Sequence, residues 1–387
     1  MRDKPRIFGI DWLEMFVSES PSVDYSAEGF RNRGFIVQER EYGTKTMAEM
    51  FTLYDQSDEP MIEIRRAPRG LNKNAEFSVY TYGDAYVRIT NKYCYIQNPM
   101  RFMLDFLESQ HYTVKKIYRI DIFTDFERFD TGDIPQNVMR RIVTHAYSKV
   151  NQSHRRTSGE DTWTQCLDNW IAWGAPGSMV STKFYNKTKE IRDTGMKKTW
   201  ILTEWLKAGY IDSMSQISRQ DQTVDMWRLE FSIKGSAKRW IYVRKDDSED
   251  GQEHYIEHHP ACYSDPHGVL NALANLIPYY FKFRIYREGV RKSNCEEKKL
   301  FDFSDEEIEM GYRLTNESDA ERIRQKWVEE DNRVIRHLWA AYKLTKGTSE
   351  GERIAQLINE MQTKVAASVD AARDYQLYNI KWPPKAQ

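Results

Sequence analysis

Apolar and polar residues alternate strictly along residues 118–127, which read Tyr-Arg-Ile-Asp-Ile-Phe-Thr-Asp-Phe-Glu. Alternation among Ile, Phe and Tyr is typical of a half-buried strand. One face then carries Arg119, Asp121 and Phe123. The other face, with Tyr118, Ile120 and Ile122, points toward a core. One such strand alone is more typical of a solvated sheet face with an ordinary ion pair.

Two further stretches have the same strand pattern. Residues 227–233 read Trp-Arg-Leu-Glu-Phe-Ser-Ile, which places Arg228, Glu230 and Ser232 on one face. Residues 182–187 read Thr-Lys-Phe-Tyr-Asn-Lys, which groups Lys183, Tyr185 and Lys187 and leaves Phe184 for the core. If the three strands share a sheet, one face carries two acids, a tyrosine and several cations.

The rest of the chain alternates strand and helix patterns. Short strand patterns cover residues 7–13, 35–37, 61–64, 77–82 and 86–89. Helical spacing covers residues 98–110, 135–150, 199–218 and 268–287, with Pro278 expected to kink or end the last helix. Residues 246–268 have the composition of a charged, His-rich loop.

This order predicts an α+β fold with mainly antiparallel sheets and helices on one side. At 387 residues the chain exceeds the usual size of one core. We expect an α+β domain over residues 1–300, built of two related half-domains at about 1–150 and 151–300. Amphipathic patterns at 319–342 and 351–375 predict a helical C-terminal region over 301–387.

Composition narrows the choice of partners. The formal net charge of −1 argues against a strongly basic coat, although Arg140 to Arg156 contains five cations and no acid. Four cysteines without a CxxC pair suit a reducing compartment. No signal peptide or run of about 20 apolar residues occurs, so we expect a cytoplasmic protein without a membrane span.

The clustered side chains have a definite chemical use. Two or three carboxylates hold a hard divalent cation such as Mg²⁺ or Mn²⁺, which polarises a phosphate. Tyr185 could then attack a DNA phosphodiester and keep a phosphotyrosine ester, with Lys183 and Lys187 on the phosphate backbone. The competing interpretation of Tyr185 is an ordinary strand aromatic.

Other chemical classes fit the sequence less well. His254, His258, His259 and Cys262 could offer zinc ligands, but their surroundings have loop composition and no second pair follows at zinc spacing. No His-hydrophobic-His strand of the other class of tyrosine nickases occurs. No Walker loop, GxSxG elbow or GxGxxG stands at a strand-helix junction, which disfavours ATPases and serine hydrolases.

Four short motifs resemble the replication initiation factor family, the rolling-circle initiators of plasmids, phages and integrative elements, also called the Rep_trans type. They are Ile10-Asp-Trp-Leu13, Arg119-Ile-Asp-Ile-Phe-Thr-Asp125, Phe184-Tyr-Asn-Lys-Thr-Lys-Glu190 and Trp227-Arg-Leu-Glu230. The resemblance spans about residues 7 to 300. It implies a sequence-specific DNA nickase of saddle-like α+β fold that uses a metal and a tyrosine retaining the 5′ phosphate, so that the freed 3′ hydroxyl primes replication or starts strand transfer.

The resemblance also assigns residues. Tyr185 matches the nucleophile, with Tyr210 and Tyr242 as other candidates. Asp121 and Glu230 match the acidic metal ligands, with Asp125 as a third. The cations expected to contact DNA are Arg119, Lys183, Lys187, Arg228 and Lys234. Origin DNA, single-stranded or supercoiled, is the expected partner, and a host helicase is a further candidate.

Two other functions are compatible with the same residues. A non-catalytic DNA-binding protein could use the same sheet face as a stacking and phosphate platform. An interaction protein organised by the C-terminal helices is the third interpretation. The sequence leaves the oligomeric state, the metal and the nick site open.

Overall fold

The three-dimensional structure is a computed structural model of the whole chain. It describes residues 4–69, 83–150, 155–157, 170–174, 178–218, 224–237, 239–243, 253–304, 313–315, 338, 341–342 and 344–360. The chain divides into two compact units, Met1–Thr315 and Asn316–Gln387. The first unit contains every labelled sheet and helix described below.

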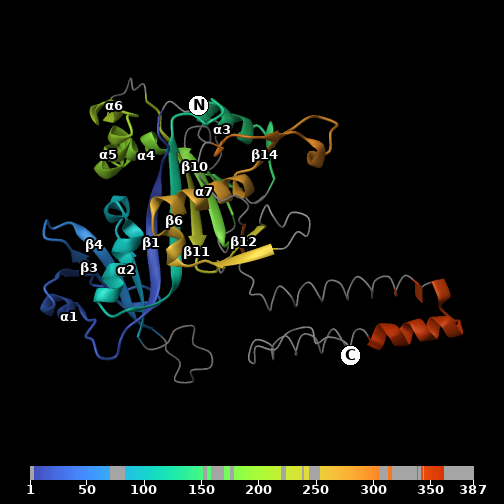
Figure 1. The fold of residues 1–387 in the computed structure, drawn as a ribbon, viewed down its shortest axis with the longest axis horizontal. Coiled ribbons are helices and arrows are strands. Elements are labelled where there is room, and N and C mark those ends of the chain that lie inside the picture. The colour runs from blue at the N-terminus through green and yellow to red at the C-terminus, as the bar shows by residue number, and fades with distance from the viewer. Residues whose placement is uncertain are drawn as a thin grey trace. The chain divides into compact units, whose positions relative to one another are not determined.

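A ten-stranded sheet runs through the first unit in the order β2-β3-β4-β5-β1-β6-β11-β10-β9-β8, and each neighbouring pair is antiparallel (Figure 1). Its strands are β1 Ile7–Ser18, β2 Ile36–Glu39, β3 Met47–Tyr54, β4 Pro60–Pro68, β5 Asp84–Ile89, β6 Thr113–Phe126, β8 Arg155–Thr157, β9 Trp170–Trp173, β10 Val180–Asn186 and β11 Trp227–Lys234. The predicted α+β class with antiparallel sheets is confirmed.

Two small sheets and several helices complete the unit. The small sheets are β13-β12-β16 (Glu253–Glu257, Arg239–Val243, Arg313–Thr315) and β15-β14-β7 (Glu297–Lys298, Phe283–Ile285, Tyr147–Lys149). The α-helices are α1 Ala27–Asn32, α2 Pro99–Ser109, α3 Pro135–Val143, α4 Lys187–Asp193, α5 Thr199–Lys207, α6 Ser215–Ser218 and α7 Pro266–Tyr280. Short 3₁₀ helices are η2 Lys92–Tyr95, η4 Pro260–Tyr263 and η5 Lys292–Asn294.

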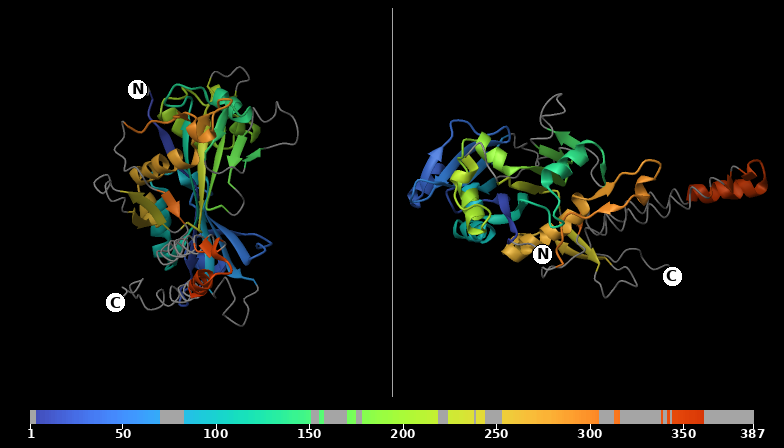
Figure 2. Two further views of the ribbon diagram at one scale, coloured as in Figure 1. Left: turned by 90° about the vertical axis from the view of Figure 1, so that its right-hand side faces the viewer. Right: turned by 90° about the horizontal axis from the view of Figure 1, so that it is seen from above.

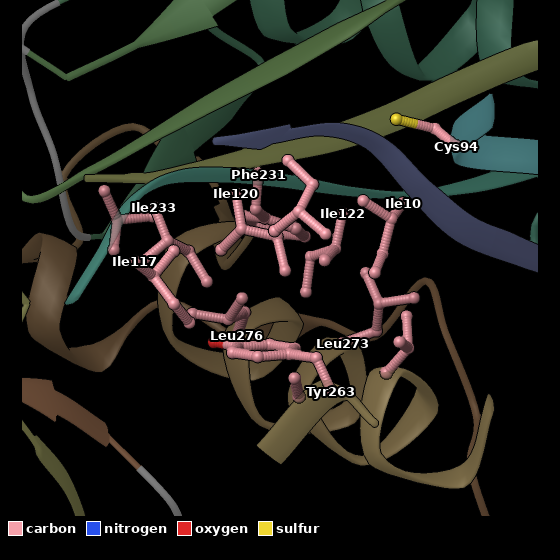
Figure 3. Packing of buried hydrophobic residues seen from close by; sticks show 14 of the residues in the cluster. Ile10, Cys94, Ile117, Ile120, Ile122, Phe231, Ile233, Tyr263, Leu273 and Leu276 are labelled. Carbon is pink, nitrogen blue, oxygen red and sulfur yellow. The ribbon is translucent and has the colours of Figure 1, made fainter. Parts of the chain in front are cut away.

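The two alternating strands that carry an Arg and an acid, β6 and β11, lie side by side near the middle of the sheet. Their apolar residues face α7, which crosses in front of the long strands in Figure 1 and lies on one side of them in Figure 2. Figure 3 shows Leu273 and Leu276 of this helix packed against Ile120 and Ile122. All four side chains are at most 1% exposed, so this layer is the main core and the opposite sheet face is left for polar residues.

Helix α7 is shorter than the sequence predicted. Asp265 caps its start by accepting a hydrogen bond from the Gly268 backbone N–H, and Pro266 occupies the first turn, where a proline is tolerated. Pro278 has no N–H to continue the helix, which ends at Tyr280. The expected helix over 268–287 is therefore wrong beyond Tyr280, because Phe283–Ile285 forms strand β14.

Three other local expectations are corrected by the backbone. Tyr118 is 40% exposed and not in the core, because the β1–β6 register shifts between Glu14 and Met15, whose partners are Arg119 and Ile117. The helix expected over 135–150 ends at Val143, since His145 has a φ of 61° and β7 follows. The loop expected over 246–268 contains β13 and η4.

Some expected elements lie outside the described residues. These are the strand at 77–82, most of the helix at 319–342, and residues 361–375 of the helix expected over 351–375. Residues 349–360 of the second unit are helical. Within the described part of the chain, no helix combines the length and apolar character that a membrane crossing would need.

A smaller core covers one end of the other sheet face. Helices α4, α5 and α6 surround it, and Trp205 packs there with Ile7 of β1 and Phe123 of β6. Trp205 is completely buried. The polar face is therefore open over only part of its length, and its covered end can exclude water from charged groups.

Ile120 tests the main core. Ile120→Ala removes a fully buried side chain from β6 and is expected to lower the free energy of unfolding by roughly 2–5 kcal/mol. Ile36→Ala is the matched control, because Ile36 is 50% exposed and its truncation should change stability by only about 0.5 kcal/mol. Urea denaturation measures both; equal losses would contradict the packing described here.

Candidate functional site: a polar groove and a buried arginine network

The open part of the polar face forms a groove with a volume of about 950 Å³, here called the polar groove. Strands β1, β4, β5, β6, β10 and β11 all contribute to it. Its charged and aromatic lining consists of Trp12, Glu14, Glu63, Arg65, Arg88, Lys116, Tyr118, Arg119, Lys183, Glu230 and Lys234. Cations outnumber acids in this lining, although the whole chain carries a formal charge of −1.

Strand register brings the predicted residues together. Glu230 of β11 lies between Lys183 of β10 and Phe123 of β6. Two residues earlier in β11, Arg228 lies between Tyr185 of β10 and Asp125 of β6. Because alternate residues share a face, these pairs are neighbours on the polar face. Thus motifs far apart in the sequence meet at the β6–β11–β10 junction.

Arg228 is the centre of a buried group, here called the Arg228 network, with Asp11, Tyr95, Asp125 and Trp205. Its guanidinium donates to both Asp125 oxygens, at 2.6 and 2.8 Å. It also donates to the Tyr95 hydroxyl at 2.9 Å and lies 3.0 Å from Asp11 Oδ1. Arg228 is fully buried, so this fork is satisfied entirely by protein groups.

The remaining partners fix the two acids. Trp205 donates its indole N–H to Asp125 Oδ2 at 2.9 Å, and Tyr95 donates to Asp11 Oδ1 at 2.6 Å. Burial opposes ionisation of Asp11, but the positive charges of Arg228 and Lys187 outweigh it and hold the pKa of Asp11 below its ordinary range. Asp11 therefore stays charged beside Arg228.

Tyr185 borders this network and is only 4% exposed. Its hydroxyl donates to Glu230 Oε2 at 3.0 Å and accepts from Lys187 Nζ at 3.1 Å. Burial, together with the charge of Glu230, raises the pKa of Tyr185 well above its ordinary value. Burial and Arg228 lower the pKa of Lys187. The phenol is therefore neutral at rest, with a carboxylate positioned to take its proton.

Asp121 is buried beside Arg119 and Ser232, which line the polar groove. Arg119 donates to both its oxygens, at 2.9 and 2.5 Å, and also donates to Ser232 at 3.1 Å. Burial, with the negative charge of Glu230 adding to it, raises the pKa of Asp121 to about 6 despite Arg119. A carboxyl that titrates this close to neutrality is a common feature of functional sites.

The acids do not form a ready metal site. Among the described residues, no three His, Cys, Asp or Glu side chains are arranged to hold a metal ion. Asp125 is engaged by Arg228 and Trp205, and Asp121 by Arg119. This donor set does not fit a divalent cation in the arrangement observed, so the roles of Asp121, Glu230 and Asp125 as ligands stay a prediction.

The zinc alternative gains no support either. His258 shares a hydrogen bond of 2.9 Å with the Tyr263 hydroxyl, and burial lowers the pKa of His258 to about 4. His259 accepts a hydrogen bond from the Ala261 backbone N–H. Both imidazoles thus have structural partners in η4.

The cations expected to contact DNA fall into two groups. Arg119, Lys183 and Lys234 line the polar groove. Arg228 and Lys187 are at most 1% exposed and belong to the interior beneath it. Of the other candidate nucleophiles, Tyr210 donates to the Pro5 carbonyl at 3.1 Å, and Tyr242 lies in β12. Tyr210, like Tyr185, is not among the residues that line the polar groove.

Sequence reasoning missed Asp11, Tyr95 and Trp205 as members of the network. Asp11 left one usable signal, because it is a lone charge within the apolar run Ile7–Leu13. Tyr95 and Trp205 left none, since each stands among other aromatic and apolar residues whose core role is equally plausible. Only the fold brings them to Arg228.

Comparisons with known proteins give a limited picture. No family model matches the chain, and no curated protein matches it. Among solved structures, the chain is similar to a rolling circle replication initiator protein from Geobacillus stearothermophilus, with 12% identity and a TM-score of 0.43 over 76% of this chain and 94% of that chain. At this level of similarity, functional inference rests on the site itself.

The Arg228 network makes a stability prediction. Arg228→Met should lower the free energy of unfolding by about 3–5 kcal/mol, because it leaves the buried Asp125 and the partly buried Asp11 without this cation. Arg101→Met is the control: Arg101 is 68% exposed and pairs with Asp105 on a helix surface, so the loss should stay below about 1 kcal/mol. Chemical denaturation that ranked the two variants equally would contradict a central role for Arg228.

Asp121 makes a pH prediction. The folded protein holds a proton on Asp121 up to about pH 6, whereas the unfolded chain loses it near the ordinary value of 3.8. Its contribution to stability is therefore present at low pH and is lost as pH rises from about 4 to 6. Over that interval the free energy of unfolding of Asp121→Asn should rise relative to that of the parent, by up to about 3 kcal/mol. Denaturation at several pH values measures the difference; a constant difference would refute the raised pKa.

Proposed function

We propose that the protein holds single-stranded DNA in the polar groove and cuts it by attack of Tyr185 on a phosphodiester, forming a 5′-phosphotyrosine link that starts replication or strand transfer. The observation that carries this proposal is the Tyr185 hydroxyl, held between the Glu230 carboxylate and the Lys187 ammonium at 3.0 and 3.1 Å. All four motifs that resemble the replication initiation factor family contribute side chains to this region.

The polar groove has the chemistry of a single-strand binding surface. Such surfaces combine cations that follow the phosphates with aromatic faces on which bases stack. Trp12 lines the groove, and the guanidinium groups of Arg88 and Arg119 lie over its ring at 4.1 and 4.6 Å. Tyr118 adds an exposed ring, whose centre lies 4.5 Å from the centre of the Tyr86 ring. Phosphates would replace part of the carboxylate pairing of these cations.

The proposed step uses the groups around Tyr185. Glu230 accepts the phenol proton as the phenol oxygen forms a bond to phosphorus. The bond between phosphorus and the 3′ oxygen breaks, and that oxygen takes a proton from solvent. Lys187 stabilises the negative charge that develops on the phenol oxygen. One phosphodiester is exchanged for another, so the reaction needs no external energy source.

Access to Tyr185 depends on Lys183. The Lys183 ammonium lies 4.3 Å from the centre of the Tyr185 ring and 5.9 Å from that of Trp170. A phosphate entering the groove attracts this ammonium away from the ring, which exposes the phenol. Binding and activation are then coupled in one side-chain movement.

The proposed step does not include a divalent metal ion. The described residues offer no group of three acidic ligands, so the Mg²⁺ or Mn²⁺ dependence expected from the sequence remains part of the hypothesis to be measured.

The second candidate function is non-catalytic DNA binding on the same face. The burial and raised pKa of Tyr185 favour it, because a neutral, enclosed phenol is a poor nucleophile.

One experiment separates cutting from binding. Wild type, Tyr185→Phe and the control Tyr210→Phe are incubated with a library of single-stranded DNA, with Mg²⁺, with Mn²⁺ or with EDTA, and then denatured. We expect a covalent adduct in wild type and Tyr210→Phe and none in Tyr185→Phe, whose DNA binding should stay within about twofold since only a hydroxyl is removed. Mass spectrometry locates the modified residue.

The other outcomes are equally decisive. DNA binding without any covalent adduct, whether Mg²⁺, Mn²⁺ or EDTA is present, would establish the non-catalytic function. An adduct on a different tyrosine would remove Tyr185 from the mechanism. The EDTA arm reports whether the predicted cation is required.

A further inference from the structure

A second cavity, here called the η2 cavity, lies outside the polar groove and has a volume of about 470 Å³. Residues 7–10 of β1, residues 94–99 around η2, and the start of α7 enclose most of it. Phe123 of β6, Tyr263 of η4 and two residues of α5, Glu204 and Lys207, complete the lining. Its size is within the usual range for small-molecule sites.

The lining combines flat apolar surface with a polar rim. Aromatic rings come from Phe8, Tyr95, Phe123 and Tyr263. The rim carries the Gln97 amide, the Lys207 ammonium and the Asp265 carboxylate, all on exposed residues. A planar ring with polar edges fits this arrangement, because its faces contact the aromatic walls while its edges reach donors and acceptors.

Backbone groups add a second set of partners. Strand β5 pairs with β1 only from Leu13 onward, whereas β6 pairs with β1 from Ile7. Between residues 7 and 10 the strand therefore has β6 along one edge and the η2 cavity beside it. A strand edge of this kind offers backbone N–H and C=O groups in alternation, which can pair with the donors and acceptors of a heterocycle.

The cavity also borders the Arg228 network. Phe123 lines it and carries the Arg228 guanidinium 3.6 Å from its ring centre. Tyr95 lines it too, and its hydroxyl bonds both Arg228 and Asp11. A ring bound here would contact Tyr95, which bonds Arg228, and Arg228 is the register partner of Tyr185.

We propose that the η2 cavity binds one unstacked nucleobase of the DNA strand, with the base between aromatic walls and its polar edge on Gln97 and the strand edge. The inference rests on the proposed function and deepens it, since the base taken up would fix which phosphate reaches Tyr185. A base removed from a single strand has little stacking to lose, so its uptake costs little. Lys207 at the rim suits the attached phosphate.

The test uses the full chain and free nucleotides. Binding of the four deoxynucleoside 5′-monophosphates is measured by saturation-transfer NMR and by titration calorimetry, with deoxyribose 5-phosphate as the probe that lacks a base. We expect at least one nucleotide to bind and deoxyribose phosphate not to bind. Loss of the base contacts in variants should weaken binding by about tenfold.

Variants place the nucleotide in the cavity. A Cβ at Gly9 would lie 3.3 Å from the Phe123 ring, closer than an ordinary contact, so Gly9→Val pushes against this wall of the cavity. Gln97→Ala removes an exposed rim amide and leaves the wall unchanged, which guards against a folding defect in the first variant. Lys189→Ala on α4 is the control for a surface substitution elsewhere, because Lys189 pairs with Asp193 and does not line the cavity.

Each outcome decides the inference. Weaker nucleotide binding in both Gly9→Val and Gln97→Ala, with Lys189→Ala unchanged, supports it. No nucleotide binding, equal binding of deoxyribose phosphate, or full binding by both cavity variants overturns it. Failure of the proposed cutting reaction would be separate, since it would appear as nucleotide binding without a covalent DNA adduct.

Discussion

A buried guanidinium is stable only if every one of its donors meets an acceptor, and Arg228 imposes this requirement on the whole first unit. Its partners come from the first strand, the turn after β5, and β6, while Trp205 of α5 secures the acid on β6. Removing any of these elements would leave charge uncompensated in a dry interior. The packing of α4, α5 and α6 on the sheet can be understood as the cover that this charge requires.

Much of the sheet could be predicted because its signals are local. Alternation along β6 and β11 gives both the strands and the faces, since side chains on a strand have a period of two. The same logic placed Lys183 and Tyr185 on the face of Glu230, which the register of β10 and β11 confirms. The prediction that Tyr118 points toward the core was wrong because a bulge interrupts the two-residue period, and such irregularities have no simple sequence signature.

The chemistry of the site was less predictable than its position. Charge type can be read from a sequence, but pairing cannot, because it depends on which cation is nearest in space. Asp121 and Asp125 lie four residues apart on one strand, yet the first meets Arg119 at the groove and the second meets Arg228 in the interior. The sequence pattern therefore predicted one shared role for the two acids, whereas the structure gives each acid a different cation as its partner.

Strand β1 has a further consequence for how this protein can vary. Its pairing with β6 shifts register three times, near Asp11, Glu14 and Phe16. The shift at Asp11 lets neighbouring residues supply the core, the Arg228 network and the polar groove in turn. Substitutions along β1 can change one of these at a time, but a single deletion would move every following side chain to the wrong face. The length of this strand is therefore more tightly constrained than its composition.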